Sequence, residues 1–143
     1  MKKLISVLLI AASLLCIASC TKKDDNTAPV EGETNYVKLE MENGDSMIIE
    51  LYPDEAPITV RNFKKLVSRH YYDGTVFHRV IEGFMIQGGA GAATDSIKGE
   101  FSANGVKNSI KHDRGVLSMA RTSDPNSATS QFFICQTREG CHH

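Results

Sequence analysis

A histidine and an arginine stand side by side at positions 78 and 79, in a β-branched run over residues 75–81 that predicts a strand. Successive side chains of a strand point to opposite faces, so the two residues lie on opposite sides of the sheet. If Arg79 faces outward as a fixed cation, His78 faces the interior, where a core histidine bonded to a neighbour is expected. The alternative for Arg79 is an ordinary surface arginine paired with an acid such as Glu82.

Two other segments could suggest a metal or a nucleotide. Three soft ligands follow one another at residues 141–143, but consecutive residues rarely form a closed tetrahedral site, so a frayed terminus is the better interpretation. The small-residue loop over residues 88–93 lacks the Lys-Ser/Thr ending and the following helix of a phosphate-binding loop. We therefore expect neither a metal nor a cofactor. Cys135 and Cys141 are expected to be free thiols, because at this spacing they could pair only across a tight turn.

Composition points to one ordinary globular domain. The chain has 143 residues, of which 41% are hydrophobic, and its formal net charge is -1. That length gives room for a single domain. The absence of a basic excess argues against a nucleic-acid partner.

The N-terminus is typical of an export signal. After a basic start, residues 4–18 form an apolar stretch that is short for a bilayer span, and it leads into Ile17-Ala18-Ser19-Cys20. This pattern resembles the bacterial lipobox. We expect residues 1–19 to be a lipoprotein signal peptide, Cys20 to be the lipidated residue and residues 20–35 to be a flexible tether. The mature protein would then be lipid-anchored in the bacterial cell envelope, facing the periplasm or on the cell surface. An ordinary secretory signal with a chance cysteine is the alternative.

The folded part is expected to consist mainly of strands. Residues 37–41 and 47–51 alternate apolar and polar side chains, and Asn43-Gly44 between them predicts a hairpin with a type I′ turn. Apolar residues then recur at helical spacing from Pro57 to a point near His70. Further strands are expected at residues 75–81, 84–87, 116–120 and 131–135. Periodicity alone cannot choose between an antiparallel barrel and a sandwich.

One long motif resembles a known family. The segment FHRVIEGFMIQGG at residues 77–89 is similar almost throughout to the signature of cyclophilin-type peptidyl-prolyl cis-trans isomerases. GVLSMA at residues 115–120 and SQFFI at residues 130–134 fit the same family, and IKGEF at residues 97–101 resembles its bacterial branch. The match runs in the right order over residues 37–135.

The resemblance implies an eight-stranded antiparallel barrel with a helix at each end and a substrate groove on its outside. It implies a monomer without cofactor or metal that rotates the peptide bond preceding proline in proline-containing polypeptides, with cyclosporin competing for the groove. The family continues beyond the last residue of this chain with closing strands and the second helix. We therefore expect the cyclophilin-like domain at residues 36–143 to be incomplete at its C-terminus.

The resemblance also assigns roles to individual residues. Arg79 matches the catalytic arginine, and His78 and His143, the latter at the groove mouth, are further candidates for the site. Groups that would bind the substrate are the proline-pocket residues Phe84, Met85 and Phe133, the polar residues Gln87 and Gln131, and the rim residues Ala120 and Arg121. Many family members carry Asn in place of Arg121.

Strand alternation tests these assignments in part. Gln131, Phe133 and Cys135 should share one face, so Cys135 is expected near the groove and not deep in the core. Strict alternation separates Phe84 from Met85, unless Gly83 kinks the backbone. Simple core packing is the alternative interpretation of all the apolar residues.

Three functions are compatible with the sequence. The first is an exported isomerase that assists folding of exported proteins. The second is a peptide-binding or holdase lipoprotein without significant turnover, and the third is an inactive truncated product. Arg79 discriminates between the first two, because binding needs the apolar pocket whereas turnover needs the cation.

Overall fold

The computed structural model describes residues 34–137, and the following statements concern that part of the chain. The predicted signal peptide, Cys20 and the C-terminal residues Cys141 and His143 lie outside the described residues. Among residues 34–137, no helix is both long and apolar enough to cross a membrane.

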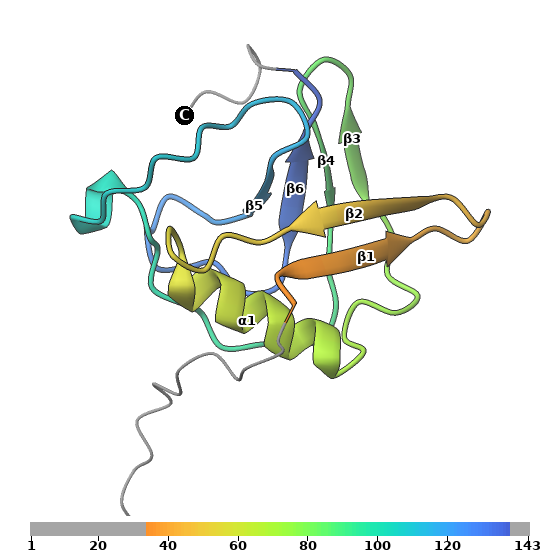
Figure 1. Cartoon of the computed structure of the whole chain (residues 1–143), viewed down its shortest axis with the longest axis horizontal. Coiled ribbons are helices and arrows are strands. Elements are labelled where there is room, and N and C mark those ends of the chain that lie inside the picture. The colour runs from red at the N-terminus through yellow and green to blue at the C-terminus, as the bar shows by residue number, and fades with distance from the viewer. Residues whose placement is uncertain (1–33, 138–143) are drawn as a thin grey trace, which may run out of the picture. The chain divides into compact units, whose positions relative to one another are not determined.

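Two antiparallel sheets and one α-helix make up the described fold (Figure 1). The first sheet is a two-stranded hairpin, and the second has the strand order β3-β4-β6-β5. Six strands and one α-helix confirm the expectation of a fold made mainly of strands, and the strands between residues 34 and 137 do not close into a barrel. The elements are β1 (Tyr36–Glu40), β2 (Ser46–Glu50), α1 (Pro57–Ser68), β3 (Arg79–Ile81), β4 (Met85–Gly88), the 3-10 turn η1 (Ser102–Asn104), β5 (Leu117–Met119) and β6 (Phe132–Cys135).

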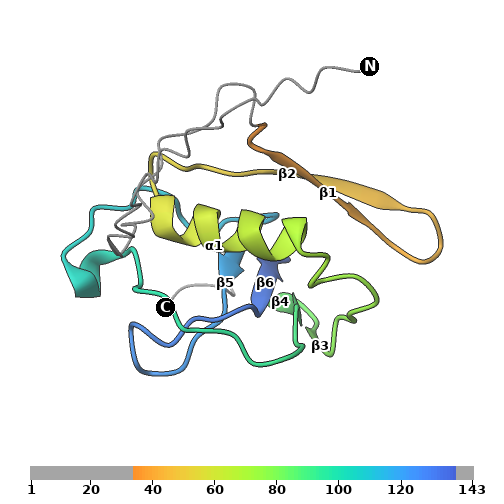
Figure 2. The ribbon, with the colours of Figure 1, turned by 90° about the horizontal axis from the view of Figure 1, so that it is seen from below.

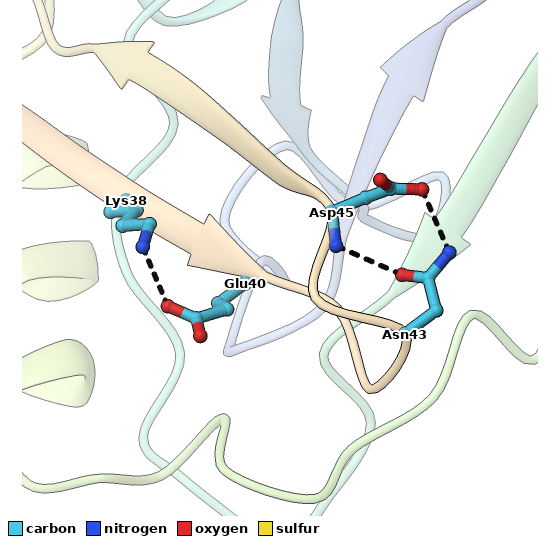
Figure 3. A network of polar contacts seen from close by, with 4 residues as sticks. All are labelled: Lys38, Glu40, Asn43 and Asp45. Carbon is cyan, nitrogen blue, oxygen red and sulfur yellow. Dashed lines mark hydrogen bonds and ion pairs between the residues drawn. The ribbon is translucent and has the colours of Figure 1, made fainter.

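The hairpin of β1 and β2 is confirmed, but its turn differs from the type I′ prediction. Gly44 has a φ of +88°, whereas Asn43 does not have a positive φ, and the Gly44 N–H donates to the Met41 carbonyl at 2.9 Å. Asn43 instead accepts a bond from the Asp45 N–H at 3.1 Å and donates to the Asp45 carboxylate at 2.7 Å (Figure 3). These bonds make a three-residue loop with glycine in the left-handed position, the next commonest hairpin connection.

Helix α1 begins at Pro57 as predicted and ends at Ser68, slightly before the expected His70. Its buried residues Val60, Phe63 and Leu66 recur at helical spacing. Two backbone N–H groups in the first turn of α1 donate hydrogen bonds to a carboxylate far along the chain. Glu100, which is buried, accepts bonds from the N–H groups of residues 58 and 59 at 2.9 and 2.8 Å.

One apolar core joins the hairpin, the helix and the larger sheet. Phe63 of α1 meets Phe132 of β6 edge to face, with ring centroids 5.9 Å apart. In Figure 2 the hairpin and the four-stranded sheet lie on opposite sides of α1, and Figure 1 shows α1 at one end of both. The core consists of the buried residues Leu51, Val60, Phe63 and Phe132, against which partly buried side chains of the hairpin and of β5 pack.

The strand predicted over residues 75–81 is much shorter in the structure. Only Arg79–Ile81 forms β3, an edge strand of the sheet. His78 lies just before β3 and is exposed, so the prediction of a core histidine is wrong. The physical reason is that residues 75–78 are not paired in a ladder, and Phe77 is the side chain of this segment that packs against the core.

Candidate active site

A polar line crosses the outer face of the four-stranded sheet. Arg79 on β3 lies opposite Gln87 on β4, and its Nη1 donates to Gln87 Oε1 at 3.4 Å. Gln87 in turn donates from Nε2 to Oε1 of Gln131, next to β6, at 2.9 Å. Arg79 therefore contacts Gln87, and no ion pair joins it to Glu82 in the described part of the chain. Three strands thus bring a cation and two amides together.

Next to this polar line, on the same face of the sheet, lies a second apolar cluster. Met85 and Cys135 are opposite each other in the β4–β6 ladder, and each is only 2% exposed. Phe84 and Phe133 are partly buried and pack against this pair. Met85 and Cys135 therefore form the buried part of the cluster, and the two partly buried aromatic side chains pack against them.

Gly83 explains how the consecutive residues Phe84 and Met85 both reach this apolar cluster. It has a φ of +70°, a left-handed conformation that a side chain would disfavour. The turn closes with a bond from the Phe84 N–H to the Ile81 carbonyl at 3.1 Å, so Phe84 precedes β4 and escapes its alternation. The kink considered from the sequence is therefore present.

Cys135 corrects one expectation. Phe133 and Cys135 share the outer face, while Phe132 and Ile134 contribute to the main core, as alternation predicted. Cys135 is among the residues that line an open hollow, but its side chain is only 2% exposed. The reason is its central position, because β6 is paired on both sides and Met85 lies directly opposite.

Two residues that the sequence analysis missed contact the cluster. The His112 ring lies 5.5 Å from the Phe133 ring, centroid to centroid. Its Nε2 is 3.1 Å from Oγ of Ser118, which is the β5 partner of Phe133. No periodic signal marks His112, because it precedes β5 in an irregular segment.

The rim residues Ala120 and Arg121 lie at the far side of the sheet. The Ala120 N–H donates to the Gln131 carbonyl at 2.8 Å and so extends the β5–β6 ladder beyond its last paired strand residue. Arg121 is exposed, and its guanidinium carbon lies 4.9 Å from the centroid of the Phe101 ring. Phe101 was not expected at the site, since it is distant in sequence.

Partly buried Tyr72 and buried Ser130 hold the strand ends that carry the two glutamines. The Tyr72 hydroxyl donates to the Ser130 carbonyl at 2.9 Å, and the Ser130 hydroxyl donates to the Gly89 carbonyl at 3.0 Å. Burial raises the pKa of Tyr72, and the neighbouring Tyr71 raises it further. Tyr72 therefore stays a neutral hydrogen-bond donor to Ser130, and the Ser130 hydroxyl ties the end of β4 to the start of β6.

The described residues offer no group of three or more His, Cys, Asp or Glu side chains that could hold a metal ion. An open hollow of about 450 Å³ lies beside the apolar cluster and not beside Arg79. Its lining is Gly83, Arg114, Gly115, Ile134, Cys135, Gln136 and Thr137.

A family model described as "Cyclophilin type peptidyl-prolyl cis-trans isomerase/CLD" matches residues 36–143. The chain belongs to the cyclophilin-type isomerase family. Its sequence is 47% identical over 108 residues to a peptidyl-prolyl cis-trans isomerase of Acinetobacter baylyi, which covers 73% of this chain and 53% of the relative. It is also 46% identical over 95 residues to peptidyl-prolyl cis-trans isomerase B of Escherichia coli, and this match covers 64% of this chain and 57% of the relative. The chain thus spans about half the length of these curated cyclophilins.

Solved structures show the same cyclophilin-like fold. A Cryptosporidium parvum cyclophilin, crystallised in the presence of the dipeptide Ala-Pro, matches with a TM-score of 0.62 and 33% identity over 72% of this chain and 68% of that one. The cyclophilin AquaCyp293 of Hirschia baltica matches with a TM-score of 0.61 and 30% identity over 73% of this chain and 59% of that one.

Proposed function

We propose that this protein is a peptidyl-prolyl cis-trans isomerase that acts on proline-containing polypeptides. The observation that carries the proposal is the placement of Arg79 beside Gln87, which lies opposite Phe133 in the neighbouring strand. A cation, two amides and an apolar cluster thus share one face of the sheet. Membership of the cyclophilin family supports the same activity.

The reaction needs a cation that acts without proton transfer. Resonance across the peptide bond sets a barrier of roughly 18–20 kcal/mol, and catalysis must favour the twisted amide over the planar one. In the twisted state the prolyl nitrogen gains a lone pair that a fixed donor can hydrogen-bond. Arginine stays charged and presents a rigid fork of N–H donors, so Arg79 can keep its weak bond to Gln87 and still offer donors to the substrate.

The other residues would hold the substrate in place. Phe84 and Phe133, which pack against the buried pair of Met85 and Cys135, would grip the proline ring through apolar contact. Gln87 is restrained by its bond to Gln131 and would orient the carbonyl next to the rotating bond. Ala120 and Arg121 would border the peptide at the rim.

Arg79→Ala tests the proposal in the full-length protein as encoded by its gene. We expect isomerisation of an Ala-Pro peptide, followed by NMR exchange spectroscopy, to fall about a hundredfold, or about 2.7 kcal/mol of transition-state stabilisation. Peptide affinity should change much less. Arg69→Ala, an exposed arginine at the end of α1, is the matched control and should retain turnover.

Near-normal turnover in Arg79→Ala would remove this arginine from the mechanism. Peptide binding without turnover in the unmodified protein would instead support the peptide-binding or holdase alternative. Cyclosporin should compete with the peptide in the same groove, and sedimentation should show a monomer.

We further propose that the two sheets belong to an eight-stranded barrel with a helix at each end. The shared core of hairpin, helix and sheet supports this, because it places both sheets around one interior. A crystal structure of the full-length protein would test the strand number directly.

The proposed location is the bacterial cell envelope, with the protein anchored through lipid on Cys20. Support comes from the apolar run and the lipobox-like residues 17–20. Two acyl chains on one residue would give stable anchoring. Cys20→Ala should abolish incorporation of a labelled fatty acid during growth, and label retained in this variant would contradict the lipobox. Such a protein would assist folding of exported proteins.

A further inference from the structure

Arg121 is an exposed cation on a fixed support. Its guanidinium lies over the Phe101 ring at 4.9 Å, and its Nη1 donates to the carbonyl of Thr122 at 2.8 Å. No carboxylate in the described part of the chain forms an ion pair with it. Contact with the aromatic face and one backbone bond position the guanidinium while leaving most of its donors unused.

The support beneath Arg121 is rigid because two segments are tied together. An isolated β-bridge joins Ile97 to Ala128, and the Asn126 side chain accepts a bond from the Gly99 N–H at 3.2 Å. The Phe101 ring lies so close to Gly99 that a Cβ there would be 2.3 Å from its Cε1. The ring is therefore closely packed on the side of Gly99, and the Arg121 guanidinium already lies over it in the free protein.

The position of Arg121 relative to Arg79 follows from the sheet. Arg79 lies on edge strand β3, whereas Arg121 follows the opposite edge strand β5, with β4 and β6 between them. The strand pairing puts Arg79 in one row with Gln87, Phe133 and Ser118, three inter-strand spacings or about 14 Å across. Arg121 lies three residues beyond Ser118, which adds about 10 Å along the strand direction, so about 17 Å separates the two backbone positions. An extended peptide advances about 3.3 Å per residue, and the glutamate and arginine side chains bridge part of the distance, so a peptide whose proline meets Arg79 can place a carboxylate near Arg121 within about four residues of the proline.

We infer that Arg121, seated on Phe101, forms a subsite for an acidic side chain of the substrate, two to four residues from the proline. The inference rests on the proposed isomerase function and adds a substrate class to it. A carboxylate suits the site because a guanidinium with free donors can bind it through two parallel hydrogen bonds. A neutral or basic side chain would leave the cation without a partner or repel it.

The experiment compares peptides with an Ala-Pro centre that differ at one position. Glu, Gln or Lys is placed in turn at each of the four positions before and after the proline, and kcat/KM is measured at low and high salt. At one position we expect Glu to exceed Gln by about threefold to fivefold at low salt, the range of an exposed ion pair. The advantage should shrink at high salt because ions screen exposed charges.

Variants then separate the subsite from the general charge of the protein. Arg121→Gln should reduce the Glu-to-Gln ratio to about one, and Arg121→Lys should keep part of it, since the charge remains. Phe101→Leu should give an intermediate ratio, because the apolar contact stays while the aromatic face is lost. Arg61→Gln removes a charge from the exposed face of α1 and should keep the full ratio.

A preference for Glu that persists in Arg121→Gln, or a wild-type protein without any preference, would overturn the inference. The ratio is taken within each variant, so a change in overall activity does not affect it. If no peptide is turned over, the proposed function fails, and the Glu-to-Gln ratio of binding affinities, from fluorescence anisotropy of labelled peptides, still decides whether the subsite exists.

Discussion

Glu100 joins two distant parts of the fold through a buried carboxylate. It is 7% exposed, and its two oxygens accept bonds from the backbone N–H groups of Ile58 and Thr59 at 2.9 and 2.8 Å. These N–H groups lie in the first turn of α1, where no neighbour in the helix can accept them. The negative charge also lies at the positive end of the helix dipole.

Glu100→Gln changes this arrangement with almost no change of shape. The amide oxygen can accept one of the two bonds, but the NH₂ group then faces the other N–H. A buried donor left unsatisfied destabilises by about 1–3 kcal/mol, and loss of a charge at a helix N-terminus adds about 0.3–1 kcal/mol. We expect a decrease of about 1–4 kcal/mol in the free energy of unfolding, a sizeable part of the roughly 5–15 kcal/mol typical of a domain.

Urea denaturation of the full-length protein, followed by circular dichroism, measures the decrease. Glu55→Gln is the matched control, because Glu55 also accepts bonds from a backbone N–H and a side chain, both of Ser109, but is only partly buried. The control should lose much less stability at neutral pH. The reasoning would be refuted if Glu100→Gln were no more destabilising than Glu55→Gln.

Further predictions concern acid stability, packing and thiol reactivity. Hydrogen bonds from the Ser109 N–H and hydroxyl hold the pKa of Glu55 below its ordinary value of 4.5. The wild-type protein should therefore be more stable than Glu55→Gln, with the full difference in unfolding free energy above pH 4.5 and none once the pH has fallen through the lowered pKa. Urea midpoints of both proteins across this pH range measure the difference. Gly99→Ala should destabilise by about 1–3 kcal/mol, because the added Cβ would be 2.3 Å from Phe101 and from a backbone carbonyl, and unfolding curves should show a loss of this size. Cys135 should react with a thiol reagent much more slowly in the native protein than in urea, as peptide mapping by mass spectrometry would show; equal rates would contradict its burial.

Local patterns in the sequence predicted most elements and their faces. The helical spacing of Val60, Phe63 and Leu66 marked the buried side of α1, and alternation over residues 131–135 separated Phe132 from Phe133. Both succeeded because helices and strands have fixed geometric periods, so the pattern of apolar residues states which side chains share a face. The family resemblance of the motif at residues 77–89 assigned Arg79 and Gln87 to one site, and the structure places the two residues opposite each other on β3 and β4.

Burial and long-range partners were decided only by the tertiary structure. Alternation assigned Cys135 to the correct face, but whether that face is covered depends on Met85, a residue of another strand. His78 is exposed because its segment is not paired, and no periodic pattern signals that. Glu100 accepts a hydrogen bond from the N–H of Ile58 at the start of α1, and the two residues are 42 positions apart in the sequence. Such contacts arise when chain segments meet in space, and a sequence period describes only the geometry within one segment.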